Sequence, residues 1–257
     1  MESLVAWFDR ELFGTGNRIG PAIVTVIGSG GKTSLIRHLA RYIAASPPPS
    51  ADQCRGGCKK PVPKMRTVLV TTTVKMFPLE GELPPGVTVA GRFNRMTGKL
   101  EALPPEDLAE RITAYDLVLV EGDGSRGLPL KGWADYEPVV PPFTTITVGV
   151  LPLWPLGKPV SEEFIHRLPF FLGLTGVAAA GDTLKIEDLV KVITGGGTEK
   201  SLFTAAIGRK ILFFNQVETE ASIFQAKKLV SLLPEDFRQR LHAIIVGSVR
   251  QDRGQGI

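Results

Sequence analysis

The sequence predicts an α/β fold in which a mostly parallel β-sheet is flanked by helices. Two observations predict it. Short apolar runs rich in Val and Ile alternate with amphipathic stretches of helical period along the chain, which is typical of strands buried in a parallel sheet. Near the N-terminus, one such run passes through a glycine-rich turn directly into a helical stretch. We therefore expect residues 1–257 to form a single domain with right-handed crossovers.

The elements follow from these periodicities in chain order. We expect strands at residues 21–27, 67–73, 116–120, 144–150, 210–214 and 241–246, the last of these being the final strand. Helices are expected at residues 2–13, 34–45, 104–112, 161–172, 186–193 and 221–233. Residues 87–100 predict a small β-hairpin that decorates the sheet edge. Residues 46–65 are rich in Pro, Gly and Lys and predict a loop insertion that need not be ordered.

Composition excludes several classes of protein. The 257 residues are 43% hydrophobic and 22% charged, which is ordinary for a globular protein. Only two Cys are present, so a disulfide scaffold is excluded. No run of membrane-spanning length occurs, and the net charge of +4 comes without a basic stripe. The N-terminus shows no secretion signal. We therefore expect a cytoplasmic protein that binds neither nucleic acid nor membrane.

The strongest motif lies between the first predicted strand and the helix after it. Common phosphate loops read G-x-x-x-x-G-K-[ST], but Val26 stands where the first glycine belongs. The shorter G-x-x-G-K-T loop that remains resembles the ATP loop of Mur-type ligases. Such glycines let backbone N–H groups approach phosphate oxygens, and the helix N-terminus adds a positive dipole. The motif comprises Gly28, Ser29, Gly30, Gly31, Lys32, Thr33 and Ser34.

This loop predicts a P-loop NTPase-like fold that binds ATP or GTP together with Mg²⁺. We expect Lys32 to bridge the terminal phosphates and the Thr33 hydroxyl to ligate Mg²⁺. The alternative, a glycine-rich turn followed by a solvated lysine, is the weaker interpretation, because strand, loop and helix all occur in the required order.

A second motif is the apolar run 116–120, which ends in Glu121-Gly122-Asp123-Gly124. Carboxylates at the carboxyl edge of a parallel sheet are well placed to face a metal ion. Glu121 and Asp123 are two residues apart, so on a continuing strand both would point to one face. One would hold Mg²⁺ and the other orient a water molecule, and the residues leave open which does which. A solvated acidic turn is the alternative.

Two further stretches end predicted strands. Lys75 follows Thr71-Thr72-Thr73, and is the best candidate there to reach the phosphate crevice. Asn215-Gln216-Val217-Glu218 has the position of the N-K-x-D motif with which GTPases recognise guanine, but Gln and Glu replace its Lys and Asp. Asn215 and Glu218 are thus candidates to contact a purine, and a strand-to-helix loop with an Asn cap fits equally well.

Three remaining residues are weaker candidates. Cys54 and Cys58 lie in the predicted loop insertion, and two thiolates cannot complete a four-ligand zinc site. His166 falls in the helix expected at 161–172, where it is a candidate acid–base group or, more commonly, a packing residue.

Taken together, these motifs resemble the YqeC family of accessory proteins associated with selenium-dependent molybdenum hydroxylases. The resemblance covers nearly the whole chain. Three features depart from the family pattern: Gly122 within Glu-Gly-Asp-Gly, the pair Gln216 and Glu218, and the Cys-containing loop. The segments that carry the resemblance are 27–35, 68–76, 118–131, 156–167, 184–189 and 211–218.

The resemblance implies a nucleotide-binding accessory protein that assists maturation of a selenium-dependent molybdenum hydroxylase, with that enzyme or its maturation factors as partners. Combined with the loop, it favours Mg²⁺-dependent hydrolysis of ATP or GTP, in which Lys32, Glu121 and Asp123 are the catalytic candidates. As a working hypothesis, we expect Thr33 and Asp123 to hold Mg²⁺ and Glu121 to orient a water molecule or the substrate. Two alternatives stay open. One is a small-molecule kinase or ligase with a short Mur-like ATP loop. The other is a carrier that binds a molybdopterin cofactor without hydrolysis.

Overall fold

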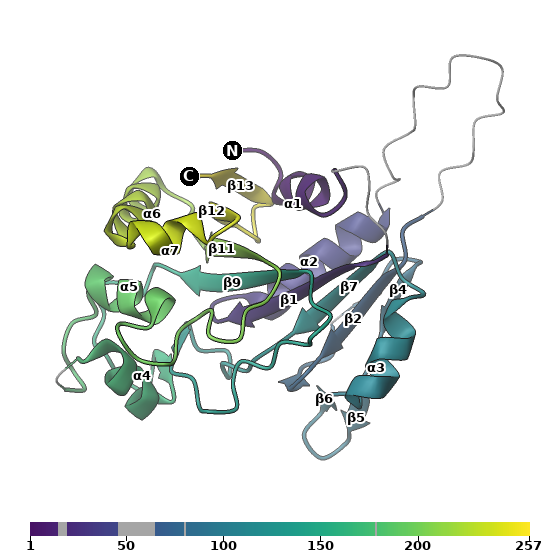
Figure 1. Ribbon diagram of the computed structural model, residues 1–257, viewed down its shortest axis with the longest axis horizontal. Coiled ribbons are helices and arrows are strands. Elements are labelled where there is room, and N and C mark those ends of the chain that lie inside the picture. Colours follow the sequence, from purple (N-terminus) through teal and green to yellow (C-terminus); the bar gives the residue numbers. More distant parts are fainter. Residues whose placement is uncertain (15–19, 46–64, 80, 178) are drawn as a thin grey trace.

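A computed structural model describes residues 1–14, 20–45, 65–79, 81–177 and 179–257 (Figure 1). Its main sheet has eight strands in the order β13-β12-β11-β9-β1-β7-β2-β4. All neighbouring pairs are parallel except β12 with β13. These strands are β1 (Ala22–Gly28), β2 (Val68–Thr72), β4 (Val87–Val89), β7 (Leu117–Glu121), β9 (Ile146–Pro152), β11 (Arg209–Asn215), β12 (Ala243–Ser248) and β13 (Arg253–Gly256).

Two small sheets accompany the main one. The first has three strands in the order β3-β6-β5, formed by β3 (Lys75–Met76), β5 (Arg92–Asn94) and β6 (Lys99–Glu101). The second pairs β8 (Leu130–Lys131) with β10 (Ile165–His166) in parallel. The helices are α1 (Leu4–Phe13), α2 (Lys32–Ala45), α3 (Pro105–Ile112), α4 (Leu168–Thr175), α5 (Ile186–Thr194), α6 (Glu220–Leu232) and α7 (Glu235–Gln239).

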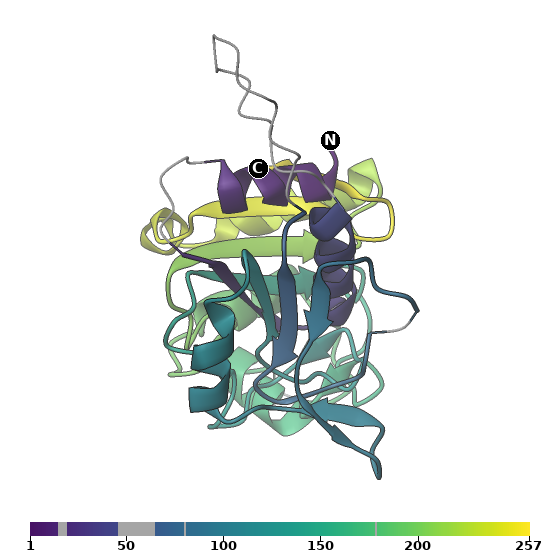
Figure 2. The ribbon, with the colours of Figure 1, turned by 90° about the vertical axis from the view of Figure 1, so that its right-hand side faces the viewer.

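Helices cover both faces of the main sheet, as the continuous apolar strands predict. Side chains of β1 alternate between the two faces. Val24 and Val26 pack with α1 and α2 in one core, whereas Ile23 packs with α3 and Ile27 with α4 to α6. Figure 2 shows the sheet between α2 on one side and α3 on the other. The predicted mixed α/β fold with a mostly parallel, helix-flanked sheet is therefore confirmed.

The strand order places a crevice beside β1. The chain passes from β1 to β2 and β4 on one side, returns through β7, and then crosses to β9, β11 and β12 on the other. Ligands of open α/β sheets bind outside the carboxyl ends of the strands at such a reversal. The loop after β1 lies at this point.

Three predicted elements differ from the structure. Of the expected hairpin 87–100, only residues 92–101 form one. Val87–Val89 instead adds to the edge of the main sheet, where its pairing with β2 satisfies backbone groups that would otherwise be open. Residues 241–246 are not the final strand, because β13 follows antiparallel to β12. The Arg-Gly-Gln-Gly sequence of β13 has no apolar alternation that could predict a strand.

The helix expected at 161–172 begins only at Leu168. Before it, β10 pairs with β8, and the N–H groups of Leu130 and Gly132 donate to the carbonyls of Phe164 and His166 at 3.1 and 2.9 Å. Arg167 then adopts a left-handed conformation (φ +58°), and a proline in the first turn starts α4. The prediction that His166 lies on a helix is therefore wrong.

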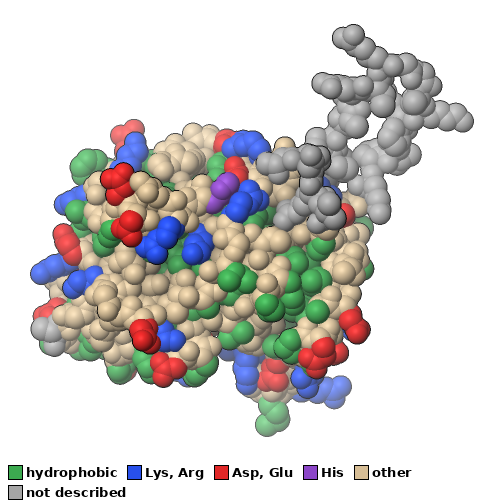
Figure 3. All heavy atoms as spheres, viewed as in Figure 1, with side chains coloured by type: hydrophobic (Ala, Val, Ile, Leu, Met, Phe, Trp, Pro, Cys, Tyr) green, Lys and Arg blue, Asp and Glu red, His purple; other side chains and the backbone are tan. Residues whose placement is uncertain are grey.

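The surface of the described residues shows no large field of one charge in the view of Figure 3, where Lys and Arg side chains are interspersed with Asp and Glu. Within the described ranges, every helix is too short or too polar to cross a membrane. The expected loop insertion lies almost wholly outside the described residues, and so do Cys54 and Cys58.

Candidate functional site

The loop between β1 and α2 has the backbone geometry of an anion-binding turn. Gly28, Gly30 and Gly31 all have positive φ, at +96°, +74° and +121°, a region that L side chains rarely adopt. Space also requires glycine, because a Cβ at Gly28 would lie 2.3 Å from the Val150 carbonyl oxygen and one at Gly31 2.3 Å from Asn215 Nδ2. The chain then enters α2 at Lys32.

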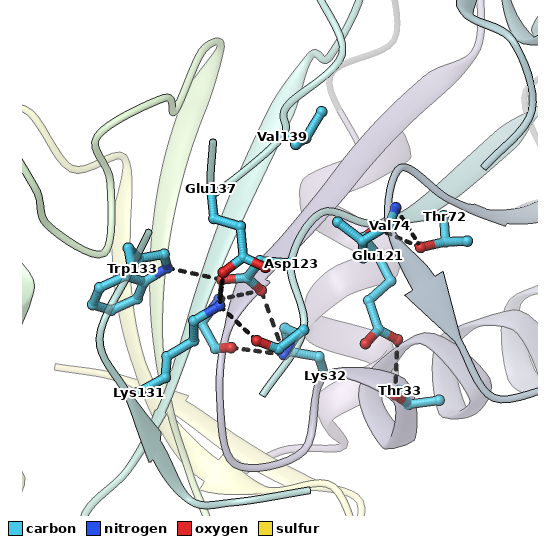
Figure 4. A network of polar contacts seen from close by, with 12 residues as sticks. Lys32, Thr33, Thr72, Val74, Glu121, Asp123, Lys131, Trp133, Glu137 and Val139 are labelled. Carbon is cyan, nitrogen blue, oxygen red and sulfur yellow. Dashed lines mark hydrogen bonds and ion pairs between the residues drawn. The ribbon is translucent and has the colours of Figure 1, made fainter. Parts of the chain in front are cut away.

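Lys32 folds back over this loop. Its side chain is only 3% exposed, and its Nζ donates to the Gly28 carbonyl oxygen at 2.7 Å. Asp123 Oδ1 lies 3.4 Å from the same Nζ (Figure 4). The ammonium group is thus held within the loop that the sequence predicts to bind phosphate.

Thr33 and Glu121, two of the residues that the sequence singles out, are in contact with each other. The Thr33 hydroxyl donates to Glu121 Oε2 at 2.7 Å. Glu121 is the last residue of β7 and is buried. Burial raises the pKa of its carboxyl group, although Lys32 and the Thr33 hydrogen bond favour the charged form. A cation beside this carboxylate would offset the cost of its burial.

Asp123 lies just beyond the end of β7 and has different partners from Glu121 (Figure 4). Its carboxylate is fully buried and accepts from the Gly28 N–H at 3.0 and 3.1 Å, from Trp133 Nε1 at 2.9 Å and from Lys131 Nζ at 3.2 Å. Asp123 therefore fixes the start of the phosphate loop. Its two oxygens already accept from three donors of the protein.

Behind Asp123 lies a buried ionic network that the sequence motifs did not identify. Lys131 is unexposed, and its Nζ also donates to Glu137 Oε2 at 2.7 Å and to the Gly124 carbonyl at 2.6 Å. Glu137 in turn pairs with Arg167. A lysine within the apolar run Leu-Pro-Leu-Lys-Gly-Trp was the one available signal, because a buried lysine requires anionic partners.

The threonines that precede Lys75 stabilise backbone near the site. Thr72 Oγ1 donates to the Glu121 carbonyl at 3.0 Å, and Thr73 Oγ1 donates to the Val139 carbonyl at 2.7 Å. The Thr71 hydroxyl is buried and has no partner among the described residues. Lys75 is exposed and forms an ion pair with Glu101 at 3.1 Å.

Asn215 connects the phosphate loop to β12. Its Nδ2 donates to the Gly30 carbonyl at 2.8 Å, and its Oδ1 accepts from the Val249 N–H at 3.1 Å. Glu218 accepts from Ser248 Oγ at 2.7 Å and pairs with Arg250 at 3.0 Å. Both predicted purine contacts thus have protein partners, and the role of Asn215 in positioning the loop is the one visible in the geometry.

Two cavities border the loop. The larger measures about 850 Å³ and reaches Lys32, Thr33, Glu121 and Lys75. The smaller measures about 610 Å³ and is bordered by α2 and Asn215. Gly31, Ser34 and Gln216 line both cavities. A ligand seated on the loop can therefore extend in either direction, while Glu218 lines neither cavity.

No group of three or more His, Cys, Asp or Glu side chains that could hold a metal ion occurs within the part of the chain that the structure describes. Mg²⁺ does not need such a group, because it commonly takes one or two protein oxygens and completes its shell with water and phosphate.

Comparison with known proteins gives two matches. A family model described as YqeC protein matches residues 59–169. "Uncharacterized protein YqeC" of Escherichia coli (strain K12) is 29% identical over 252 residues, and the match covers 90% of this chain and 89% of that protein. No solved structure matches the chain.

Proposed function

With the chain assigned to the YqeC family, we propose that it binds a purine nucleoside triphosphate with Mg²⁺ on the Gly28–Ser34 loop and hydrolyses it. The biological role that the family resemblance implies is assistance in the maturation of selenium-dependent molybdenum hydroxylases.

The observation that carries the proposal is the loop itself. Three glycines with positive φ lead into α2, and Lys32 is the first residue of that helix. The N–H groups of a helix N-terminus and a lysine at its start form a strong site for phosphate oxygens. The Ser29 hydroxyl is buried in the loop without a hydrogen-bond partner among the described residues, so a bound anion would also supply an acceptor there.

The residues present fit a bound Mg²⁺ ion. Thr33 Oγ1 and Glu121 Oε2 lie 2.7 Å apart and supply the hard oxygen ligands that Mg²⁺ prefers. The sequence led us to expect Asp123 as a Mg²⁺ ligand, but its carboxylate already accepts from the Gly28 N–H, Trp133 and Lys131. We therefore propose Thr33 and Glu121 as the ligands and a loop-positioning role for Asp123. When bound, Mg²⁺ would neutralise charge on the terminal phosphates.

Lys32, the loop N–H groups and the smaller cavity have separate roles in the proposed binding of the nucleotide. Lys32 and the loop N–H groups stabilise negative charge on the phosphate oxygens, which is the main electrostatic contribution to phosphoryl transfer. To do so, Lys32 exchanges its contact with the Gly28 carbonyl for phosphate. The purine is proposed to lie in the smaller cavity, where Tyr42 and Asn215 are among the lining residues.

Calorimetric titration with ATP, GTP and AMP, with and without Mg²⁺, tests the proposal when phosphate release is measured in the same samples. We expect Mg²⁺-dependent binding of a triphosphate and much weaker binding of AMP, because the loop contacts the terminal phosphates. Lys32→Met is expected to abolish this binding, whereas Lys228→Met, a matched change on the exposed side of α6, leaves it unchanged. A folded wild-type protein that binds neither triphosphate would overturn the proposal.

A second candidate function is favoured by the size of the larger cavity. At about 850 Å³ it extends well beyond Lys32 and Thr33 and has room for a phosphate acceptor, as a small-molecule kinase or ligase requires. Release of ADP that depends on an added acceptor would favour this function. Binding of a molybdopterin cofactor without any phosphate release would favour the carrier alternative.

A further inference from the structure

The larger cavity beside the phosphate loop is lined by further segments of the chain that have no role in the proposed nucleotide binding. The loop and the start of α2 form its floor. Residues 74–77 and Lys99, which belong to the small β3-β6-β5 sheet, form one wall. Another part of the lining consists of residues 124–127 after β7, together with His166 and Arg167 at the end of β10. Segments far apart in sequence thus enclose one space.

Cationic side chains dominate these two walls. Lys75, Lys99, Arg126 and Arg167 line them, whereas Glu137 is the one carboxylate there apart from Glu121 among the described residues. Glu137 is already neutralised by Lys131 and Arg167. A cavity with such an excess of positive charge favours an anionic ligand.

Two of the four cations are not paired with a carboxylate. Among the described residues, the Arg126 side chain has no hydrogen bond or ion pair, and the Lys99 ammonium group has neither but lies over the Phe77 ring, with its Nζ 4.5 Å from the ring centroid. Lys75 and Arg167, by contrast, pair with Glu101 and Glu137. Arg126 and Lys99 come from different segments of the chain and both line the cavity, so each can contribute positive charge to an anion bound there.

Aromatic rings from three separate segments also face this cavity. Phe77, Tyr136 and Trp154 all line it, and they are 61%, 68% and 46% exposed. Large exposed aromatic side chains that gather around one cavity are typical of ligand sites. A planar ring can stack on such side chains with little entropic cost, since each ring has only two rotatable side-chain bonds.

Backbone strain is concentrated around the same cavity. Among the described residues, four other than glycine have positive φ: Arg126, Arg167, Gln216 and Asp252. The first three line the cavity. Conformations of this kind cost on the order of 1–2 kcal/mol each for an L-residue, and they cluster at functional sites. At Arg126 and Arg167, the positive φ changes the direction of the chain next to the cavity.

His166 adds an uncharged acceptor to the cationic wall. Burial, with the charges of Arg167, Lys131 and Arg126, lowers its pKa to about 4, so its imidazole is neutral at physiological pH. Its side chain makes no hydrogen bond to any described residue. A neutral imidazole can accept a hydrogen bond from an N–H or O–H group of a ligand.

We propose that this cavity is the site of a second ligand, a small molecule that combines a planar ring with a phosphate or carboxylate group. The ring stacks against the side chains of Phe77, Tyr136 and Trp154, the anionic group lies between Arg126 and Lys99, and His166 accepts a hydrogen bond from the ring. The proposal rests on the proposed function, because the ligand would lie next to the terminal phosphate of the nucleotide on the loop.

Calorimetry with 1-naphthyl phosphate and 1-naphthoate as probes tests the site, with ADP and Mg²⁺ saturating the loop. We expect at least one of the two probes to bind, and 1-naphthol and inorganic phosphate, which carry only the ring or only the charge, to bind more weakly. The double variant Arg126→Gln with Lys99→Gln should bind the probe about tenfold more weakly, as expected for the loss of two charge-assisted hydrogen bonds of partly exposed groups. Its affinity for ADP should change less than about threefold.

Arg95→Gln is the matched control, because Arg95 is exposed on the same hairpin and does not line the cavity. It should leave probe affinity unchanged. Equal probe affinity in the double variant and the wild type would overturn the proposal, and so would the absence of binding by both probes or displacement of the probe by ADP. Failure of the proposed nucleotide site would give a different result. The protein would then bind no ADP, but it would still bind the probe, and the double variant would still bind the probe more weakly than the wild type.

Discussion

Replacement of Lys131 by Met is expected to destabilise the protein strongly. Lys131 Nζ lies 3.2 Å from Asp123 Oδ2 and 2.7 Å from Glu137 Oε2, and all three side chains are at most 5% exposed. Met has a similar length and fills the same volume beside Trp133, so the change removes mainly the charge. Two buried carboxylates then lose the cation they share.

The loss of stability depends on the partners that Asp123 and Glu137 keep in the variant. Removal of one partner of a buried ion pair costs about 3–5 kcal/mol of unfolding free energy, because the other charge stays buried. Asp123 keeps its hydrogen bonds from the Gly28 N–H and Trp133, and Glu137 keeps Arg167. We therefore expect the lower end, about 3 kcal/mol, against a total stability of about 5–15 kcal/mol. For a chain of this length the Tm would fall by roughly 6–12 °C.

Urea unfolding of the wild type and the Lys131→Met variant at neutral pH measures this loss. Lys228→Met, an exposed lysine of α6, is the matched control and should change stability by less than about 0.5 kcal/mol. A loss below about 1 kcal/mol at neutral pH would refute the reasoning.

Two further predictions concern titration. Burial raises the pKa of Glu121 above its usual value of 4.5, so its contribution to stability is present at acid pH and is lost as pH rises through the folded-state pKa. The Glu121→Gln variant keeps a side-chain oxygen that can accept from Thr33. It should therefore unfold at a higher temperature than the wild type at neutral pH, and at the same temperature well below pH 4.5. Equal melting temperatures at neutral pH would contradict this prediction. His166, with a pKa of about 4, should show constant imidazole chemical shifts by NMR between neutral pH and pH values near 6, whereas a midpoint close to the usual 6.5 would show that the ring is better solvated than its burial indicates.

The sequence alone predicts the elements that depend on local pattern. Strands β1, β7 and β11 are continuous apolar runs, and α2 carries an apolar face at helical spacing, so their residues are recognisable without neighbours. The strand, glycine loop and lysine of the phosphate loop are likewise adjacent in the chain. The polar strand β13 and the two-residue strand β10 form because a neighbouring strand offers backbone hydrogen-bond partners. The spacing of apolar residues in the sequence does not predict such partners.

Local sequence thus determined the apolar strands, the phosphate loop and the acidic residues at the end of β7, because hydrophobic burial and backbone conformation depend on neighbouring positions in the chain. The tertiary structure decided which carboxylate meets which partner. Glu121 accepts a hydrogen bond from Thr33, whereas Asp123 accepts hydrogen bonds from the Gly28 N–H and Lys131. These contacts join segments 8 to 95 residues apart. Desolvation and charge pairing act through space, so the division of roles between two carboxylates only two positions apart required the folded chain.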